Sequence, residues 1–237
     1  MKKTIIYSIA ALALFAGLVS CEKSSGPEFT YPNAVVTLKS HPETGRFYMQ
    51  LDDKTTLLPV NVEKNPYEKE VRAFVNYSET DADPKGFSKA VNLNAVDTIL
   101  TKMMAPFKGS NEENFRTYGQ DPIEITKQAW PTVIEDGYLT VVIRTVFSGY
   151  MARPHEVNLV RGEQPGEIIL CHDAKGDVYG NYWASNVVAF RLSDLGDLGE
   201  ISPEGTTLTL KWNGFNGDRK ETFTYIPRKD DTSAQVE

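Results

Sequence analysis

The sequence has few residues of the kinds that form covalent links or bind metals. Its 237 residues include only two cysteines, Cys21 and Cys171, and three histidines, His41, His155 and His172. Two cysteines allow no disulfide framework, so core packing must stabilise the fold. The histidines are spread along the chain without the spacing of a zinc site. We expect no metal site and no cofactor.

The motifs of common enzyme classes are also missing. No serine stands in a G-x-S-x-G turn, and no glycine-rich loop is present to bind phosphate. Cys171 and His172 are neighbours, but adjacent residues on a strand point to opposite faces and do not meet. His155 and His172 each share a face with apolar residues, which favours histidines at the edge of a core. The sequence therefore nominates no catalytic residue, although a carboxylate pair contributed by distant strands stays an alternative.

Clusters of basic residues are absent. The formal net charge is −7, and it becomes −9 when the first 20 residues, which hold Lys2 and Lys3 and no acid, are removed. Basic residues such as Lys102 and Arg116 are scattered among acids, a pattern typical of a solvated surface. An acidic chain of this kind argues against nucleic acid as a partner.

The one long apolar run lies near the N-terminus and spans 15 residues, from Ile5 to Val19. A membrane-spanning helix needs roughly 20 apolar residues. Two lysines precede the run and Leu18-Val19-Ser20-Cys21 ends it, so the segment resembles the signal peptide of a bacterial lipoprotein. The alternative is an ordinary secretory signal in which Cys21 is incidental.

The lipoprotein interpretation predicts that residues 1–20 are removed, that Cys21 carries lipid, and that residues 21–32 form a flexible tether. Lipidation of Cys21 would anchor the chain to the outer membrane of the cell envelope. The sequence leaves open whether the periplasmic or the cell-surface face is occupied.

The rest of the chain has the alternating apolar pattern of β-strands. Segments 46–51 and 71–77 are clear examples, and five short strands between residues 33 and 104 predict a small closed barrel, since closure removes exposed edges. Residues 105–120 are predicted to form a connecting loop with one helical turn at 112–118.

A second set of strands begins at residue 121. Segments such as 138–147 and 207–212 alternate, and Gly/Asn turns separate them, which predicts an antiparallel β-sandwich over residues 121–227. Residues 228–237 are polar and are predicted to be a disordered tail. The predicted fold class is all-β, a barrel followed by a sandwich.

One stretch suggests a binding surface. Residues 179–186 are predicted to form a loop in which Tyr179, Tyr182 and Trp183 stand among small and amide residues, a composition favoured at binding surfaces. The alternative is that Tyr182 or Trp183 folds back into the sandwich core.

Several separate blocks of the chain carry a resemblance to a known family. The blocks are Thr56-Leu57-Leu58-Pro59-Val60-Asn61, residues 70–77, residues 118–123, residues 134–141, residues 155–160 and Phe190-Arg191-Leu192. Together they resemble the NigD-like lipoproteins of the Bacteroidota. The resemblance implies an N-terminal OB-type barrel and a C-terminal β-sandwich. It implies no catalytic residues; the bacteriocin gene neighbourhood that named the family has suggested an immunity role.

These observations favour a membrane-anchored, non-enzymatic binding protein of the cell envelope. The expected partner is a protein, a peptide or a glycan, and immunity against a secreted toxin is one version. A hydrolase acting on envelope or dietary glycans is the first alternative, and a structural subunit of an envelope assembly is the second.

Overall fold

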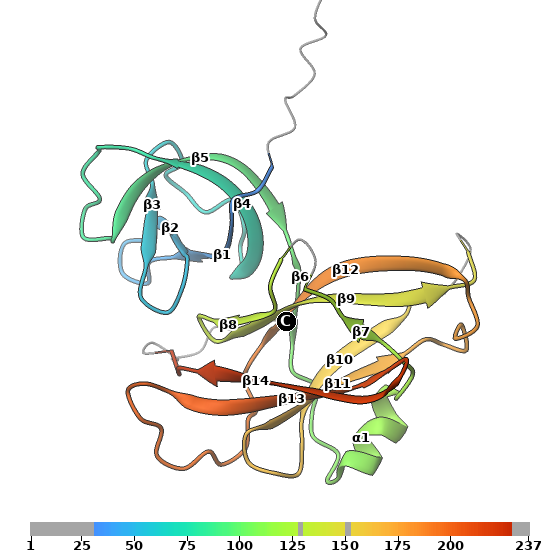
Figure 1. Ribbon diagram of the computed structural model, residues 1–237. Helices are drawn as coiled ribbons and strands as arrows, with labels where there is room; N and C mark the ends of the chain where they lie inside the picture. The colour runs from blue at the N-terminus through green and yellow to red at the C-terminus, as the bar shows by residue number, and fades with distance from the viewer. Residues whose placement is uncertain (1–30, 128–129, 150–152, 229–237) are drawn as a thin grey trace, which may run out of the picture.

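The computed structural model describes residues 31–127, 130–149 and 153–228 and shows a barrel beside a two-sheet sandwich (Figure 1). The predicted signal peptide, the predicted lipidation site Cys21 and most of the predicted tether lie outside the described residues. Within these ranges, no helix has the length and apolar character that crossing a bilayer requires.

The N-terminal unit is a closed five-stranded barrel with the order β1-β2-β3-β5-β4. Strands β3 and β5 pair in parallel and the other neighbours pair antiparallel. Inward side chains such as Val36, Leu38 and Phe47 are fully buried, and closure gives every strand two partners. The strands are β1 (Ala34–Ser40), β2 (Phe47–Gln50), β3 (Thr56–Pro59), β4 (Val71–Glu79) and β5 (Lys89–Thr98).

The C-terminal unit is a sandwich of two sheets with the core between them. Leu139, Val141 and Phe190 of one sheet pack with Ile168 and Leu210 of the other, and all five side chains are fully buried. The first sheet contains β10 (Glu156–Arg161), β11 (Glu167–Asp173), β13 (Thr206–Gly214) and β14 (Gly217–Tyr225). The second contains β6 (Leu100–Met103), β12 (Tyr182–Arg191), β9 (Tyr138–Phe147) and β7 (Glu124–Ile125), with β8 (Val133–Glu135) paired to β9.

The all-β class and the order of barrel and sandwich are confirmed. The structure adds two parallel pairs within the sandwich, β11 with β13 and β12 with β6. Parallel neighbours need long crossover connections, and the sequence pattern does not reveal which strands such connections join.

The segment between the two units belongs structurally to the sandwich. Residues 100–104 are predicted to belong to the barrel, but β6 pairs with β12. Residues 105–120 are predicted to form a connecting loop, whereas residues Asn111–Tyr118 form helix α1, which packs on β10 and β11. The side chain of Ser110 caps α1 by accepting a hydrogen bond from the Glu113 N–H at 3.1 Å.

A buried arginine joins the barrel to the sandwich. Arg72 of β4 is fully buried, and its guanidinium donates to the hydroxyl oxygens of Thr140 at 3.2 Å and Thr37 at 3.1 Å. It also forms an ion pair with Glu135 at 3.3 Å. Burial lowers the pKa of Arg72, and the charge of Glu135 opposes that change. A buried guanidinium is stable only with such partners.

A second junction is centred on the carboxylate of Glu70. It accepts hydrogen bonds from the Tyr138 hydroxyl at 2.6 Å, from Arg191 at 3.1 Å, and from Arg228 at 2.7 and 3.0 Å. Arg228 Nε also lies 3.1 Å from Asp136. Burial alone would raise the pKa of Glu70, but hydrogen bonding and the charge of Arg228 lower it.

The predicted disordered tail begins at residue 228, but Arg228 is an ordered part of this junction, with a side chain only 8% exposed. Its acidic partners lie far away in the sequence, so the local polarity of the segment did not reveal them. Residues 229–237 lie outside the described residues.

Candidate functional site

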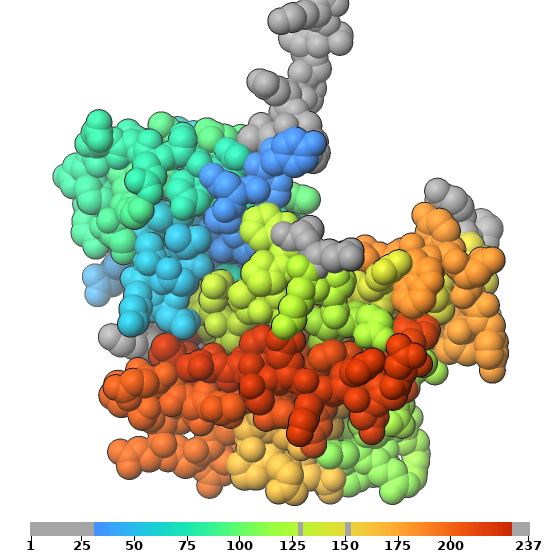
Figure 2. Space-filling model, viewed as in Figure 1, coloured from blue at the N-terminus to red at the C-terminus, as the bar shows by residue number. Residues whose placement is uncertain are grey.

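The predicted aromatic residues lie at the end of the longest strand pair in the sandwich. Strands β9 and β12 pair over ten positions, from Tyr182 opposite Phe147 to Arg191 opposite Tyr138. Tyr179 is 96% exposed, Tyr182 54% and Trp183 42%. In Figure 2 this end of the sandwich, coloured yellow to orange, projects beyond the rest of the molecule. We call it the aromatic end and define it by Tyr179, Tyr182 and Trp183.

The strand pattern divides these residues between two faces. Tyr182 and Trp183 are consecutive in β12, so their side chains point to opposite sides of the sheet. Trp183 lies on the outer side with Arg144, whose guanidinium carbon is 4.6 Å from the Trp183 ring centroid. The ring of Phe215 lies 4.9 Å from it. The structure thus builds a Trp–Arg–Phe cluster on one face, while Tyr182 lies on the other.

The predicted loop at residues 179–186 is in large part strand, because β12 begins at Tyr182. Hydrogen bonding to β9 extends the ladder further than the polar composition suggests. Gly180 allows this close approach: a Cβ at this position would lie 2.0 Å from the carbonyl carbon of Phe147. The backbone of the aromatic end is therefore held against the end of β9.

Two histidines meet near the same end, inside the sandwich. His155 Nδ1 lies 3.0 Å from His172 Nε2, and Phe147 stacks on His155 with ring centroids 4.2 Å apart. They line a hollow of about 280 Å³. The sequence pattern predicts both histidines at a core edge but does not indicate the distance between them.

The hydrogen bonds assign the tautomers of this pair. His172 Nδ1 faces the Pro122 carbonyl oxygen at 3.0 Å, and a carbonyl only accepts, so Nδ1 carries the proton. His172 Nε2 then accepts from His155 Nδ1. His155 Nε2 lies 3.6 Å from an Asp177 carboxylate oxygen, which is beyond hydrogen-bond distance. Burial, then the neighbouring His155, lowers the pKa of His172.

Cys171 takes no part in this pair. It lies on the opposite face of β11, fully buried with Val160 and Ile169 beneath α1. Burial raises the pKa of its thiol to about 12, which removes the thiolate at neutral pH. Among the described residues, no group of three or more His, Cys, Asp or Glu side chains is placed to hold a metal ion.

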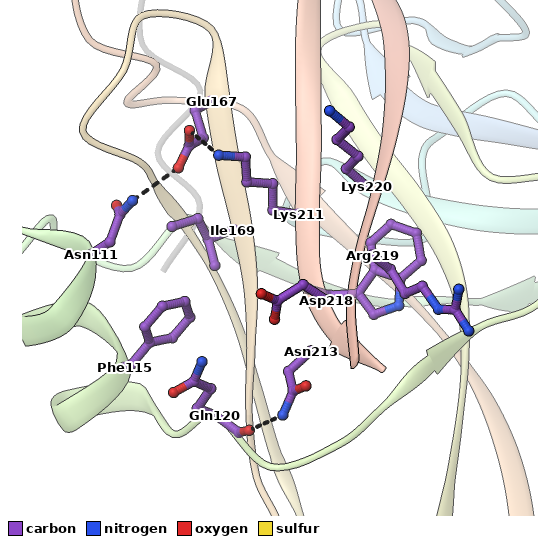
Figure 3. Close-up of a pocket in the computed structure, with 11 residues that line it drawn as sticks. Asn111, Phe115, Gln120, Glu167, Ile169, Lys211, Asn213, Asp218, Arg219 and Lys220 are labelled. Carbon is purple, nitrogen blue, oxygen red and sulfur yellow. Dashed lines mark hydrogen bonds and ion pairs between the residues drawn. The ribbon is translucent and has the colours of Figure 1, made fainter. Parts of the chain in front are cut away.

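A groove of about 420 Å³ lies between α1 and strands β13 and β14 (Figure 3). Figure 3 shows Phe115 and Gln120 on the helix side, facing Asp218 and Asn213 on the strand side. Ile169 forms part of the apolar floor. No sequence motif marks this groove, because separate segments of the chain contribute its walls.

Two carboxylates line the groove, Glu167 and Asp218. Glu167 is only 5% exposed, and its carboxylate accepts from Lys211 at 2.6 Å and from Asn111 at 3.0 Å. It is therefore engaged in a structural ion pair. Asp218 and Gln120 have no side-chain partner among the described residues.

Two family models match this arrangement of units. The model of the NigD-like N-terminal OB domain matches residues 35–99, and that of the NigD-like C-terminal beta sandwich domain matches residues 105–225. The chain belongs to the NigD-like family. The family that the sequence blocks indicated is thus confirmed, and both matches follow the units that the structure shows.

Solved structures resemble this NigD-like chain over most of its length. A protein of Parabacteroides distasonis, provisionally described as toxin-related, is 29% identical, with a TM-score of 0.61 over 81% of this chain and 91% of its own. A NigD-like immunity protein of Bacteroides caccae is 18% identical, with a TM-score of 0.50 over 84% and 100%. A protein of Bacteroides fragilis, provisionally described as a lipoprotein, is 13% identical, with a TM-score of 0.53 over 81% and 97%. The last two show a shared fold alone. No curated protein matches the chain.

Proposed function

We propose that this NigD-like protein is a lipid-anchored binding protein of the cell envelope, and that its aromatic end contacts a polypeptide partner. The exposure of Tyr182 and Trp183 carries the proposal. Large aromatic side chains are usually buried, and a projecting pair at the end of a strand is typical of an interface.

The chemistry of the aromatic end favours a protein over other partners. Tryptophan, tyrosine and arginine are the residue types that contribute most to protein–protein binding, and Trp183 and Arg144 stand in contact. Tyr182 faces the other side of the same strand, so a partner that encloses this end can bury both rings. Gly180 and the β9 ladder hold the backbone in place, which limits the entropy lost on binding.

Immunity is one form of this proposal. The similar Parabacteroides distasonis protein carries a toxin-related description, and the Bacteroides caccae protein is described as an immunity protein. Those descriptions belong to those proteins, and they lend support to a secreted polypeptide toxin as the partner here.

The anchor has its own test. We expect Cys21→Ser to move the protein from the membrane fraction of the producing cells to the soluble fraction. An unchanged membrane fraction would contradict lipidation at Cys21. This test is independent of the aromatic end, because Cys21 precedes every described element.

The binding surface is tested by chemical cross-linking in intact cells, followed by identification of the captured partner. Trp183→Ala should reduce capture about 10-fold or more, the effect of losing a central interface residue. Leu100→Ala is a matched control, because Leu100 is 63% exposed and lies outside the aromatic end. Equal capture by both variants would contradict the assignment.

The alternatives receive less support from the described residues. The hydrolase alternative requires two carboxylates in acid and base roles, and Glu167 of the groove is engaged with Lys211. The structural-subunit alternative predicts a stable complex in gentle extracts that survives loss of Trp183, so the same variant separates it from the proposal.

A further inference from the structure

A second hollow, of about 420 Å³, lies on the barrel, far in sequence from the aromatic end. Two connections form it, residues 41–46 between β1 and β2 and residues 80–88 between β4 and β5. Its lining residues are His41, Thr44, Arg46, Lys85, Gly86 and Phe87. We call it the barrel hollow.

The polar side chains of the barrel hollow all offer hydrogen-bond donors. Arg46 and Lys85 carry two formal positive charges, and no carboxylate lines the hollow. The Glu43 N–H donates to His41 Nδ1 at 3.3 Å, which leaves the proton of a neutral His41 on Nε2. The Arg46 N–H donates to Thr44 Oγ1 at 3.3 Å, so the Thr44 hydroxyl proton is free to donate.

The cations of the hollow differ from those of the domain junction in their contacts. Among the described residues, the side chains of Arg46 and Lys85 form no ion pair or hydrogen bond. Arg46 Nε is buried without an acceptor. A buried donor without an acceptor costs free energy, and an anion in the hollow would supply the missing acceptor. By contrast, Arg72 and Arg228 are both fully engaged.

The apolar part of the lining indicates what the anion is attached to. Phe87 forms one wall, and its ring packs against His41 at 6.4 Å and Tyr48 at 5.3 Å between centroids. These contacts hold Phe87 in place as a surface for the carbon part of a ligand. Donors from several side chains suit the oxygens of a phosphate group, which accepts from several directions.

We propose that the barrel hollow binds an organic phosphoester, with Arg46 and Lys85 contacting the phosphate and Phe87 contacting its organic part. The net negative charge of the whole chain gives no indication of this positively charged site. Arg46 and Lys85 are 39 positions apart in the sequence, and only the folded barrel brings them together. The phosphate can come from a free phosphomonoester or from a lipid headgroup, which share this chemistry.

The test uses the protein from residue 22 onward, which contains every described element. Titration calorimetry with glycerol phosphate should give saturable binding that weakens as salt rises, because the charges are partly exposed to solvent. Lys85→Gln and Arg46→Gln should each weaken binding roughly 10- to 100-fold, the effect of losing one charge-assisted hydrogen bond. Lys85 is exposed, so its variant keeps the test valid even if Arg46→Gln misfolds.

Lys64→Gln is the control, because Lys64 is an exposed lysine of the same unit outside the barrel hollow. Losses equal to those of Lys85→Gln would overturn the proposal, since binding would then follow net charge alone. A second arm measures co-sedimentation with phosphatidylcholine vesicles that contain or lack phosphatidylglycerol. Lys85-dependent binding to the anionic vesicles supports a lipid source, and Lys85-dependent binding to glycerol phosphate alone supports a soluble source. Failure to bind in both arms overturns the proposal.

Discussion

His155 and His172 face each other across neighbouring strands, with Nδ1 of the first 3.0 Å from Nε2 of the second. The ring of Phe147 stacks on His155, and the carbonyl oxygens of Asp121 and Pro122 lie beside His172 Nδ1. Because the Pro122 carbonyl accepts the Nδ1 proton and His172 Nε2 accepts from His155 Nδ1, both ring nitrogens of His172 are hydrogen-bonded when His172 is neutral.

Stability should therefore fall as the pH drops below about 6.5. The folded pKa of His172 is below its ordinary value of 6.5, so between those values the unfolded chain binds a proton that the folded chain does not. For one proton, the free energy of unfolding falls by at most about 1.4 kcal/mol per pH unit. Urea unfolding measured from neutral pH to about pH 5 checks this slope, because that range lies above the ordinary pKa values of Asp and Glu. His172→Gln should flatten the slope, and an unchanged slope would contradict the assignment.

The junction of barrel and sandwich should depend on Arg72. Arg72→Met keeps most of the side-chain volume but leaves Glu135, Thr37 and Thr140 without their donor. We expect the free energy of unfolding to fall by about 3 kcal/mol, the lower end for breaking a buried pair, because Glu135 is partly exposed. Arg116→Met, which removes surface pairs on α1, should change it by less than about 0.5 kcal/mol. A small effect at Arg72 would mean that the two units are held together in another way.

Arg228 should stabilise the protein although it lies close to the C-terminus. Arg228→Gln removes the paired hydrogen bonds to Glu70 and the contact with Asp136. The expected loss is about 2–3 kcal/mol, because both carboxylates are largely buried. Arg219→Gln is the control: Arg219 is exposed and without a partner among the described residues, so its loss should stay within about 0.5 kcal/mol. Equal thermal denaturation curves for the two variants would refute the role of Arg228.

Gly180 should be required for the shape of the aromatic end. Gly180→Ala places a Cβ 2.0 Å from the Phe147 carbonyl carbon, so the chain must move away from β9. We expect lower capture of the partner and a destabilisation of about 1–3 kcal/mol, as for other overpacked sites. Gly176→Ala is the comparison, because Gly176 has a φ of 86° and open space around it, so the substitution strains the backbone without a clash. If Gly176→Ala reduces capture as much, general destabilisation of this part of the sandwich, rather than the Phe147 contact, explains the effect.

The sequence predicted the parts of the fold that local patterns determine. Alternation located β9 and β13, and the strand patterns predicted a barrel followed by a sandwich, in agreement with the family resemblance. It did not predict that β6 leaves the barrel, because parallel pairing with β12 depends on a crossover of many residues. It also placed Arg228 in a disordered tail, since neither Glu70 nor Asp136 is near it in the sequence.

The candidate sites also divide into those that local sequence patterns indicate and those that only the fold assembles. Aromatic composition led to Tyr179, Tyr182 and Trp183, and the structure shows all three exposed, with Tyr182 and Trp183 in a strand rather than a loop. Their role in binding stays a prediction. The groove beside α1 and the barrel hollow are assembled from segments that no single motif connects, so only the fold brings them into view.

Site-specific photo-cross-linking in intact cells is the decisive test of whether the aromatic end contacts a polypeptide partner. A photoreactive phenylalanine analogue, which keeps an aromatic ring at the substituted position, replaces Trp183 in one strain and Leu100 in another, both exposed apolar positions. We expect a discrete cross-linked polypeptide from position 183 that is missing from position 100 and lost when Arg144→Gln is added. The same products from both positions, or none from position 183, would contradict it.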